Sequence, residues 1–206
     1  MRKLATLLVL MFLVPTPAAR AASSLRLNEI LAGPARDWDG SGALSTRDDE
    51  WVEVVNTGGT PLDLTGHLIT DGDRLPRFGL TGVLDSGARR LVFGRDAVDW
   101  ERANAFPVFG LSLGNTGDQV MLWQVVGPDT VLVDSYTYLT HEAAADRAIG
   151  RATDGGPWML FDGLNPYTGT TPPLGSGCLP TPGTANACGV TPSRQMTWGS
   201  LKALYR

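Results

Sequence analysis

Glycine and proline interrupt this chain every few residues, which restricts it to short secondary-structure elements. The 206 residues include 25 Gly and 14 Pro. Proline lacks an N–H donor, and glycine loses the most backbone entropy on ordering, so both tend to end regular structure. Almost no segment repeats apolar residues at helical spacing. The sequence therefore favours short strands joined by turns.

Runs rich in β-branched and aromatic residues lie between these interruptions, as strands require. Turn signals such as Asp71-Gly72 and Gly114–Asp118 separate them. One helical turn is expected at Thr140–Ala148, with Thr140 as N-cap. Seven or eight short strands predict an all-β sandwich. The expected strands are Leu25–Leu31, Trp51–Asn56, Leu62–Thr70, Arg77–Leu80, Arg89–Phe93, Gln119–Val126 and Val131–Tyr138, with a late pair around Trp158–Phe161.

The first 22 residues have the features of a secretory signal peptide. Arg2 and Lys3 precede an apolar run, and Ala19-Arg20-Ala21 supplies a small-x-small cleavage pattern. The apolar run is too short for a transmembrane helix, and no later stretch is long enough either. We therefore expect an exported protein, periplasmic or extracellular, without stable membrane insertion.

Net charge argues against two classes of partner. Without Arg2, Lys3 and Arg20, 14 Lys+Arg stand against 21 Asp+Glu, a net charge of −7. Binding to nucleic acid or to an anionic membrane needs clustered cations, so neither is expected. The remaining roughly 185 residues suit one domain with tails. We expect the sandwich over residues 23–164, a Pro/Gly-rich irregular extension over 165–192, and a short tail over 193–206.

Two features lie in these C-terminal segments. Cys178 and Cys188 flank a Pro/Gly loop, and in an oxidising compartment they are expected to pair and staple that loop rather than the core; two free thiols are the alternative. The tail Met196–Arg206 would gather apolar residues on one face of a short helix, although Gly199 weakens it. It is either a disordered tail or a docking or sorting peptide. The docking residues would be Trp198, Leu201, Leu204 and Tyr205.

A glutamate stands in the middle of the apolar strand Trp51–Asn56. Alternation places Glu53 on the same face as Trp51 and Val55. If the strand carrying Glu29 is a neighbour, the two carboxyl groups could face each other, an arrangement that suggests acid–base work or a metal. The alternative, which we prefer, is that each accepts hydrogen bonds from backbone or arginine at the sandwich edge.

The loop Asp37–Asp48 is close to a twelve-residue calcium loop. Counting Asp37 as position 1, side-chain oxygens fall at positions 3, 5 and 12, and a glycine falls at position 6. Position 12 is Asp rather than the longer Glu, and the flanks are strands rather than helices. The expected Ca²⁺ ligands are Asp37, Asp39, Ser41 and Asp48. The alternative is an acidic surface loop whose Asp and Gly simply form turns.

Enzyme chemistry has weak support. Gly110-Leu111-Ser112-Leu113-Gly114 matches a nucleophile-elbow pattern, and Asp134 and His141 follow in hydrolase order. That pattern needs a strand-to-helix turn, whereas here it leads into a hairpin. A metallohydrolase motif such as His-Glu-x-x-His is absent from the sequence. We therefore expect a non-enzymatic protein with no catalytic residues.

Several of these segments, in this order, resemble one family. Leu27-Asn28-Glu29-Ile30 is followed by Asp49–Asn56, Leu62–Asp71 and Leu111–Asp118, and the chain later reaches Thr181-Pro182-Gly183-Thr184-Ala185-Asn186. This order resembles the lamin-tail domain of secreted bacterial proteins over about Leu25 to Asn186. His67 departs from the family, which commonly has Trp there. The residues that carry the resemblance are Glu29, Glu53, Asn56, Gly66, Asn115 and Asp118.

The resemblance implies an immunoglobulin-like sandwich and a non-catalytic binding or scaffolding module. Its partner would be a protein or glycan of the cell envelope or exterior. Calcium, expected separately from the spacing of the Asp37–Asp48 loop, is the cofactor we consider. Two alternatives stay open: a passenger domain whose tail is the sorting signal, and a hydrolase accessory domain. A fold of this kind does not by itself identify the ligand.

Overall fold

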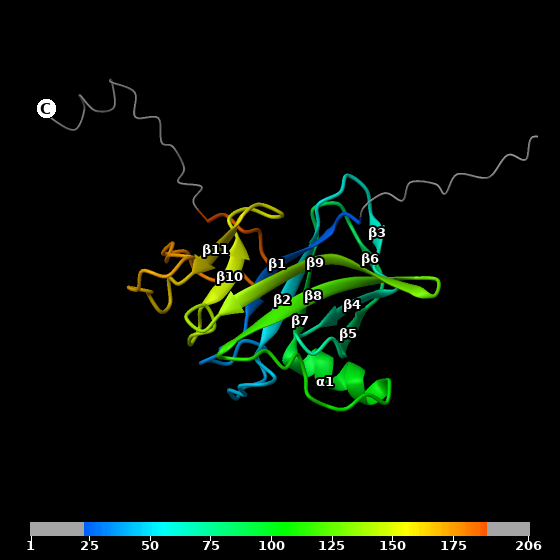
Figure 1. Ribbon diagram of the computed structural model, residues 1–206, viewed down its shortest axis with the longest axis horizontal. Helices are drawn as coiled ribbons and strands as arrows, with labels where there is room; N and C mark the ends of the chain where they lie inside the picture. The colour runs from blue at the N-terminus through cyan, green and yellow to red at the C-terminus, as the bar shows by residue number, and fades with distance from the viewer. Residues whose placement is uncertain (1–22, 189–206) are drawn as a thin grey trace, which may run out of the picture.

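The computed structural model describes residues 23–188, which form a mainly β molecule with one helix (Figure 1). The expected signal peptide and the tail that contains Trp198, Leu201, Leu204 and Tyr205 lie outside these residues. The elements in order are β1 (Leu25–Leu31), β2 (Trp51–Asn56), β3 (Leu62–Asp63), β4 (His67–Thr70), β5 (Pro76–Leu80), β6 (Val83–Leu84), β7 (Arg89–Phe93), α1 (Gly94–Ala103), β8 (Gly117–Val126), β9 (Asp129–Leu139), β10 (Ala148–Arg151) and β11 (Trp158–Phe161).

Two antiparallel sheets carry most of the structure. The first has the strand order β11-β10-β1-β2-β7 and the second β5-β4-β8-β9, while β3 and β6 form a small ribbon. Side chains from both sheets share one hydrophobic core, as Leu27 and Val54 of the first sheet and Ile69 and Leu122 of the second illustrate. Because alternate residues of a strand face opposite sides, these positions define the inner face of each sheet.

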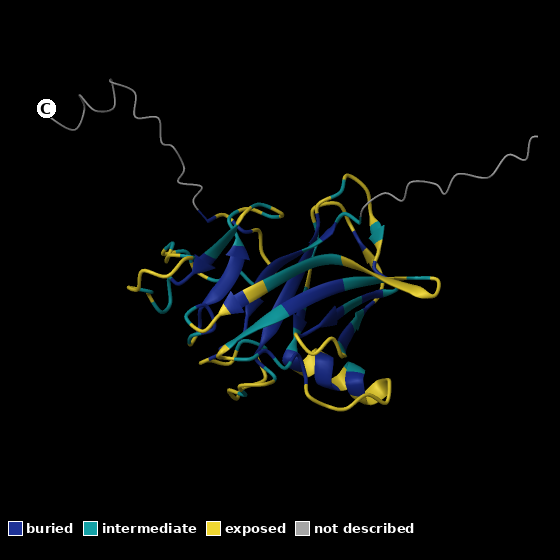
Figure 2. Ribbon diagram, viewed as in Figure 1, coloured by how far each residue is buried: buried dark blue, intermediate teal, exposed yellow. Residues whose placement is uncertain are grey.

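Every residue of β2 is buried, so both faces of the strand are covered; the strand is dark blue in Figure 2. Val52 and Val54 face the shared core, whereas Trp51 belongs to a second cluster on the outer face with Phe161 and Cys188. The C-terminal segment supplies Cys188 and covers this outer face. A disulfide expected to staple only a loop therefore also lies against buried apolar side chains.

Helix α1 lies against two edge strands, β7 of the first sheet and β5 of the second. It follows β7 directly, and a Cβ atom on Gly94 would lie only 1.8 Å from the Arg47 carbonyl oxygen, so this position requires glycine. On the other side Trp100 packs against Gly79 and tilts over Phe78, with ring centroids 6.3 Å apart. The helix thus covers one edge of the shared core.

Two expectations about local structure are wrong. Thr140–Ala148 is not helical, because its residues form turns and Ala148 already begins β10. The expected strand Leu62–Thr70 is divided into β3 and β4 by a turn in which Gly66 has φ +81°. Within residues 23–188, α1 is the sole helix, and it is too short to cross a bilayer.

Candidate metal centre and carboxyl pair

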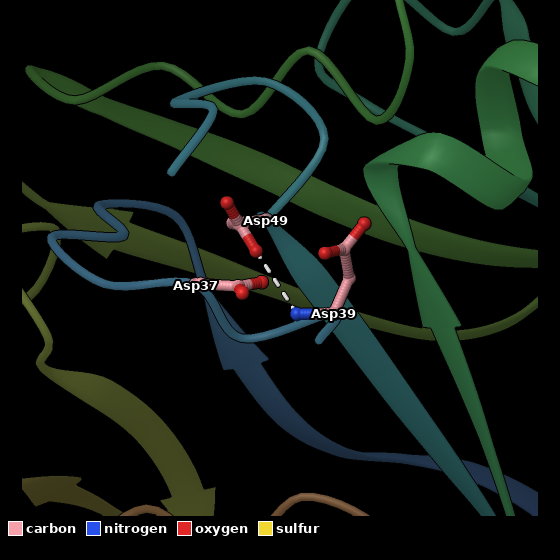
Figure 3. Close-up of side chains that lie close together, drawn as sticks. All are labelled: Asp37, Asp39 and Asp49. Carbon is pink, nitrogen blue, oxygen red and sulfur yellow. Dashed lines mark hydrogen bonds between the residues drawn. The ribbon is translucent and has the colours of Figure 1, made fainter. Parts of the chain in front are cut away.

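Three aspartates come together where the loop after β1 enters β2 (Figure 3). One carboxylate oxygen from each of Asp37, Asp39 and Asp49 lies within 4.8 Å of the other two. Oxygen atoms at this spacing could hold a metal ion.

The loop is folded around the Asp49 carboxylate. Its Oδ1 accepts hydrogen bonds from the backbone N–H groups of Trp38 (2.6 Å) and Asp39 (2.9 Å), and its Oδ2 accepts one from Ser45 (2.7 Å). Asp49 is fully buried at the start of β2, so it anchors the loop to the sheet. The bonds to Trp38 and Asp39 hold the segment that carries Asp37 and Asp39 close to the Asp49 carboxylate.

The carboxylates of Asp37 and Asp39 shape the tip of the same loop. Asp37 accepts hydrogen bonds from the N–H groups of Ser41 (3.0 Å) and Gly42 (2.7 Å), where Gly42 has φ +92°. Asp39 Oδ1 accepts a second bond from Ser41 (2.8 Å). The tip is thus held by its own acidic side chains, whose orientation these hydrogen bonds fix.

Electrostatics at Asp39 favour a cation. Burial alone would raise the pKa of this carboxyl, but hydrogen bonds from Ser41 and with Asp37, together with the charge of Arg95, lower it overall. The Asp39 side chain is only 1% exposed, and its buried Oδ2 forms no hydrogen bond although Arg95 Nη1 lies 3.2 Å away. One guanidinium beside three carboxylates leaves negative charge that a metal ion would neutralise.

The expected ligands Ser41 and Asp48 are placed differently. Asp48 accepts a hydrogen bond from Arg47 Nε at 2.6 Å and is not part of the three-carboxylate group, in which Asp49 stands instead. Ser41 stays at the loop tip, where its hydroxyl donates to the Ala43 carbonyl (3.1 Å). The sequence spacing therefore predicted the loop correctly, but the buried carboxylate of the group is Asp49, one position after the predicted Asp48.

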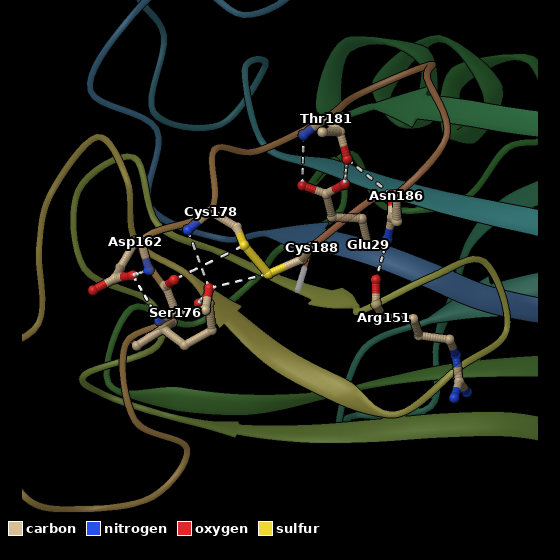
Figure 4. Close-up of a disulfide and its surroundings, with 10 residues drawn as sticks. Glu29, Arg151, Asp162, Ser176, Cys178, Thr181, Asn186 and Cys188 are labelled. Atoms are coloured by element: carbon tan, nitrogen blue, oxygen red, sulfur yellow. Dashed lines mark hydrogen bonds between the residues drawn. A yellow bond between two sulfur atoms is a disulfide. The ribbon is translucent and has the colours of Figure 1, made fainter. Parts of the chain in front are cut away.

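The two glutamates also come together. Glu29 of β1 is the direct cross-strand partner of Glu53 of β2, and both are fully buried. Glu29 Oε1 accepts a hydrogen bond from the Thr181 N–H (2.9 Å), and Glu29 Oε2 lies 2.6 Å from the Thr181 hydroxyl oxygen (Figure 4). Glu53 accepts bonds from Asn28 Nδ2 (2.8 Å) and Gly183 N–H (2.7 Å). Both carboxyl groups therefore bind the segment Thr181–Asn186.

The contacts of the Thr181 hydroxyl indicate that Glu29 is protonated. The single hydroxyl hydrogen of Thr181 faces two oxygens, Glu29 Oε2 at 2.6 Å and Asn186 Oδ1 at 2.8 Å. The Asn186 amide nitrogen already donates to the carbonyls of Asn28 and Arg151, so its oxygen must accept. Both contacts are satisfied when Glu29 donates to Thr181 and Thr181 donates to Asn186. Burial is the main cause that raises the Glu29 pKa to about 8; the neighbouring Glu53 charge raises it further, whereas the hydrogen bond from the Thr181 N–H lowers it.

The other residues that carry the resemblance lie in turns. Asn56 is fully buried; its Nδ2 donates to the carbonyls of Thr60 (2.8 Å) and Leu84 (3.0 Å), and its Oδ1 accepts from Gly58 N–H. Asp118 accepts hydrogen bonds from Gly114 and Gly72 N–H groups. Asn115 is exposed in the turn before β8, and Gly66 makes the turn before β4.

The expected disulfide between Cys178 and Cys188 is formed. It closes the loop that contains Thr181 and Asn186, and Figure 4 shows this loop beside Glu29. The bond and the two glutamates therefore restrain the same segment.

The hydrolase-like residues have other partners. Asp134 accepts hydrogen bonds from Leu27 N–H (3.0 Å) and Arg151 Nη2 (2.8 Å). His141 Nε2 lies 3.2 Å from the Pro173 carbonyl, and the His141 ring stacks on Tyr167. Ser112 contacts neither of them through any hydrogen bond among residues 23–188.

Comparison of the chain with protein-family models, curated protein sequences and solved structures gives no match.

Proposed function

We propose that the chain is an exported, non-catalytic binding module with an immunoglobulin-like sandwich of lamin-tail type, and that its loop at Asp37, Asp39 and Asp49 binds Ca²⁺. The observation that carries the proposal is the approach of these three carboxylates to within 4.8 Å of one another beside a single arginine.

The donor set favours calcium over other biological metals. Three carboxylates without histidine or thiolate suit a hard cation, and Ca²⁺ accepts irregular shells of six to eight oxygens. Mg²⁺ requires near-ideal octahedral geometry, which a loop organised by backbone hydrogen bonds does not impose. Bound calcium would order the loop that leads into β2. Because Trp51 at the start of β2 belongs to the outer-face cluster, this would also stabilise the outer face of the first sheet.

The lamin-tail assignment is supported by how its signature residues interact. Glu29 and Glu53, far from Thr181 and Gly183 in sequence, bind them directly. Asn56 ties its own turn to the carbonyl of Leu84. These three signature residues therefore each hold a turn or a distant segment in place, which is a structural role.

The same contacts support a non-catalytic role. Glu29, Glu53 and Asp134 each bind backbone groups that hold segments in place, which leaves them unsuited to attack a substrate. The disulfide agrees with an exported protein, because disulfides persist in oxidising compartments.

The experiment is affinity capture by the mature protein from envelope and extracellular fractions, with calcium or with a chelator. We expect one partner to be retained only with calcium, and this retention to be lost in Asp37→Asn/Asp39→Asn but kept in Asp48→Asn. Deletion of Met196–Arg206 should leave retention unchanged. Loss of retention in the deletion variant would instead favour the tail as the functional element.

A further inference from the structure

The outer face of the second sheet carries a groove beside a tryptophan. Ile69 and Leu122 point into the core, so their neighbours Leu68 and Trp123, cross-strand partners on β4 and β8, point outward. The groove has a volume of about 260 Å³. Its lining residues are Leu68, Thr70, Arg74, Pro76, Trp123 and Thr130.

The indole of Trp123 is held in a fixed orientation. Its Nε1–H donates to Thr70 Oγ1 at 3.0 Å, and the Thr70 hydroxyl donates in turn to the Asp71 carbonyl. Thr70 is buried, whereas Trp123 is half-buried. A ring fixed in this way loses little conformational freedom when a ligand stacks on it.

Arg74 supplies the one charge among the groove's lining residues. Its guanidinium carbon lies 6.0 Å from the Trp123 ring centroid, and the residue has φ +62°, an uncommon conformation for a non-glycine residue. The side chain is exposed and forms no ion pair with any carboxylate of residues 23–188. Asp71, three residues earlier, is instead paired with the buried Arg77.

From these features we propose that the groove binds a sugar ring that carries a carboxylate, such as a uronic acid residue of an acidic glycan. The apolar face of the pyranose stacks on Trp123, the carboxylate pairs with Arg74, and the Thr130 hydroxyl, which has no hydrogen-bond partner within the described chain, bonds a ring hydroxyl. The volume suits a ligand of one ring, since it lies below the range for drug-sized molecules.

Charge complementarity selects this occupant. The mature chain is expected to be acidic, so an arginine without a carboxylate partner at an aromatic groove provides local attraction for an anion that the surface as a whole would repel. A neutral sugar could not form an ion pair with the Arg74 guanidinium, and a small inorganic anion could not contact the Trp123 ring and the apolar lining of the groove. This inference rests on the proposed binding function and names its ligand class.

The test is a titration with tri-galacturonate, with its methyl ester as the uncharged match and benzoate as a carboxylate without a sugar ring. The signal is the Trp123 indole N–H resonance, identified by its loss in Trp123→Phe. We expect saturable shifts with tri-galacturonate, at least tenfold weaker binding of the ester, and no shift with benzoate. Arg74→Gln should weaken tri-galacturonate binding at least tenfold, whereas Arg102→Gln, a substitution at an exposed arginine of α1, should not change it.

Equal binding of the acid and the ester, stronger binding of benzoate, or no shift at millimolar tri-galacturonate would overturn the inference. The same samples are melted with and without calcium. If calcium raises the melting temperature while the sugar fails to bind, the acidic-sugar assignment is wrong and the proposed calcium-binding module stands. If calcium leaves the melting temperature unchanged and the sugar also fails to bind, both proposals are wrong.

Discussion

Glu29 lies directly opposite Glu53 in the pairing of β1 with β2, and the two buried carboxyl groups bind one loop, through Thr181 and Gly183. Two carboxylates placed side by side without water would repel each other. A proton on Glu29, which the contacts of the Thr181 hydroxyl with Glu29 and Asn186 favour, removes this repulsion. The pair thus fastens the C-terminal segment to the sheet.

The first prediction concerns pH. Burial raises the Glu29 pKa from 4.5 to about 8 and the Glu50 pKa also to about 8. Between these values the folded state binds more protons than the unfolded state, so the free energy of unfolding should fall as pH rises from about 5 to 8. Glu29→Gln should reduce this fall by on the order of 3 kcal/mol.

Denaturant unfolding at several pH values measures that slope. Glu29→Gln/Glu50→Gln should flatten it further than either single change. A variant slope equal to that of the unchanged protein would contradict the protonated state of Glu29.

The second prediction concerns Asn56. Its removal leaves the carbonyl of Leu84 without its buried donor, so Asn56→Ala should lower the free energy of unfolding by about 3 kcal/mol. Asn115→Ala, at an exposed turn position, is the matched control and should change it by less than about 0.5 kcal/mol. Equal effects in chemical denaturation would contradict the structural role of Asn56.

The third prediction concerns the disulfide. Cys178 and Cys188 are separated by 10 residues in sequence, and opening this loop should cost about 2–3 kcal/mol of stability. Reduction, or Cys178→Ser/Cys188→Ser, should lower the melting temperature and allow proteases to cut between the two positions first. Cleavage that begins elsewhere would show that the glutamates alone hold the segment.

The fourth prediction concerns a buried ion network beneath α1. Arg77 is 3% exposed, binds Asp71 in the β4–β5 turn and lies 3.6 Å from Glu101 of α1. Arg77→Met leaves two buried carboxylates without their cation and should destabilise the fold by about 3–5 kcal/mol. Arg102→Met, at the exposed end of the same helix, should have little effect in thermal melts.

The strands were predictable where local pattern and tertiary structure agree. β1, β2 and β7 have the predicted bounds, and β11 lies where the late pair was expected, because each is a short apolar run bounded by residues that interrupt strands. Helix α1 was missed because it begins with glycine and because its buried face, Gly94, Ala97, Val98 and Glu101, has helical spacing but only two apolar side chains. Glu101 is buried because it accepts hydrogen bonds from Phe109 and Gly110 N–H groups, a contact that sequence spacing does not reveal.

The candidate site was predictable in part for a similar reason. The run from Asp37 to Asp49 indicates an acidic loop, but which aspartate turns inward depends on the direction in which β2 enters the sheet. Asp49 turns inward and collects three backbone N–H groups, while Asp48 turns to Arg47. The pairing of Glu29 with Glu53 could be anticipated by alternation, but its loop ligands, more than a hundred residues away, could not.

The most direct test of the account is calcium titration by isothermal calorimetry of the mature protein, of Asp37→Asn/Asp39→Asn and of Asp48→Asn. These changes keep side-chain size and remove charge inside or outside the three-carboxylate group. We predict one saturable calcium site in the unchanged protein and in Asp48→Asn, with binding weakened at least tenfold in the double variant. No heat of binding at millimolar calcium, or equal binding by all three proteins, would contradict the account.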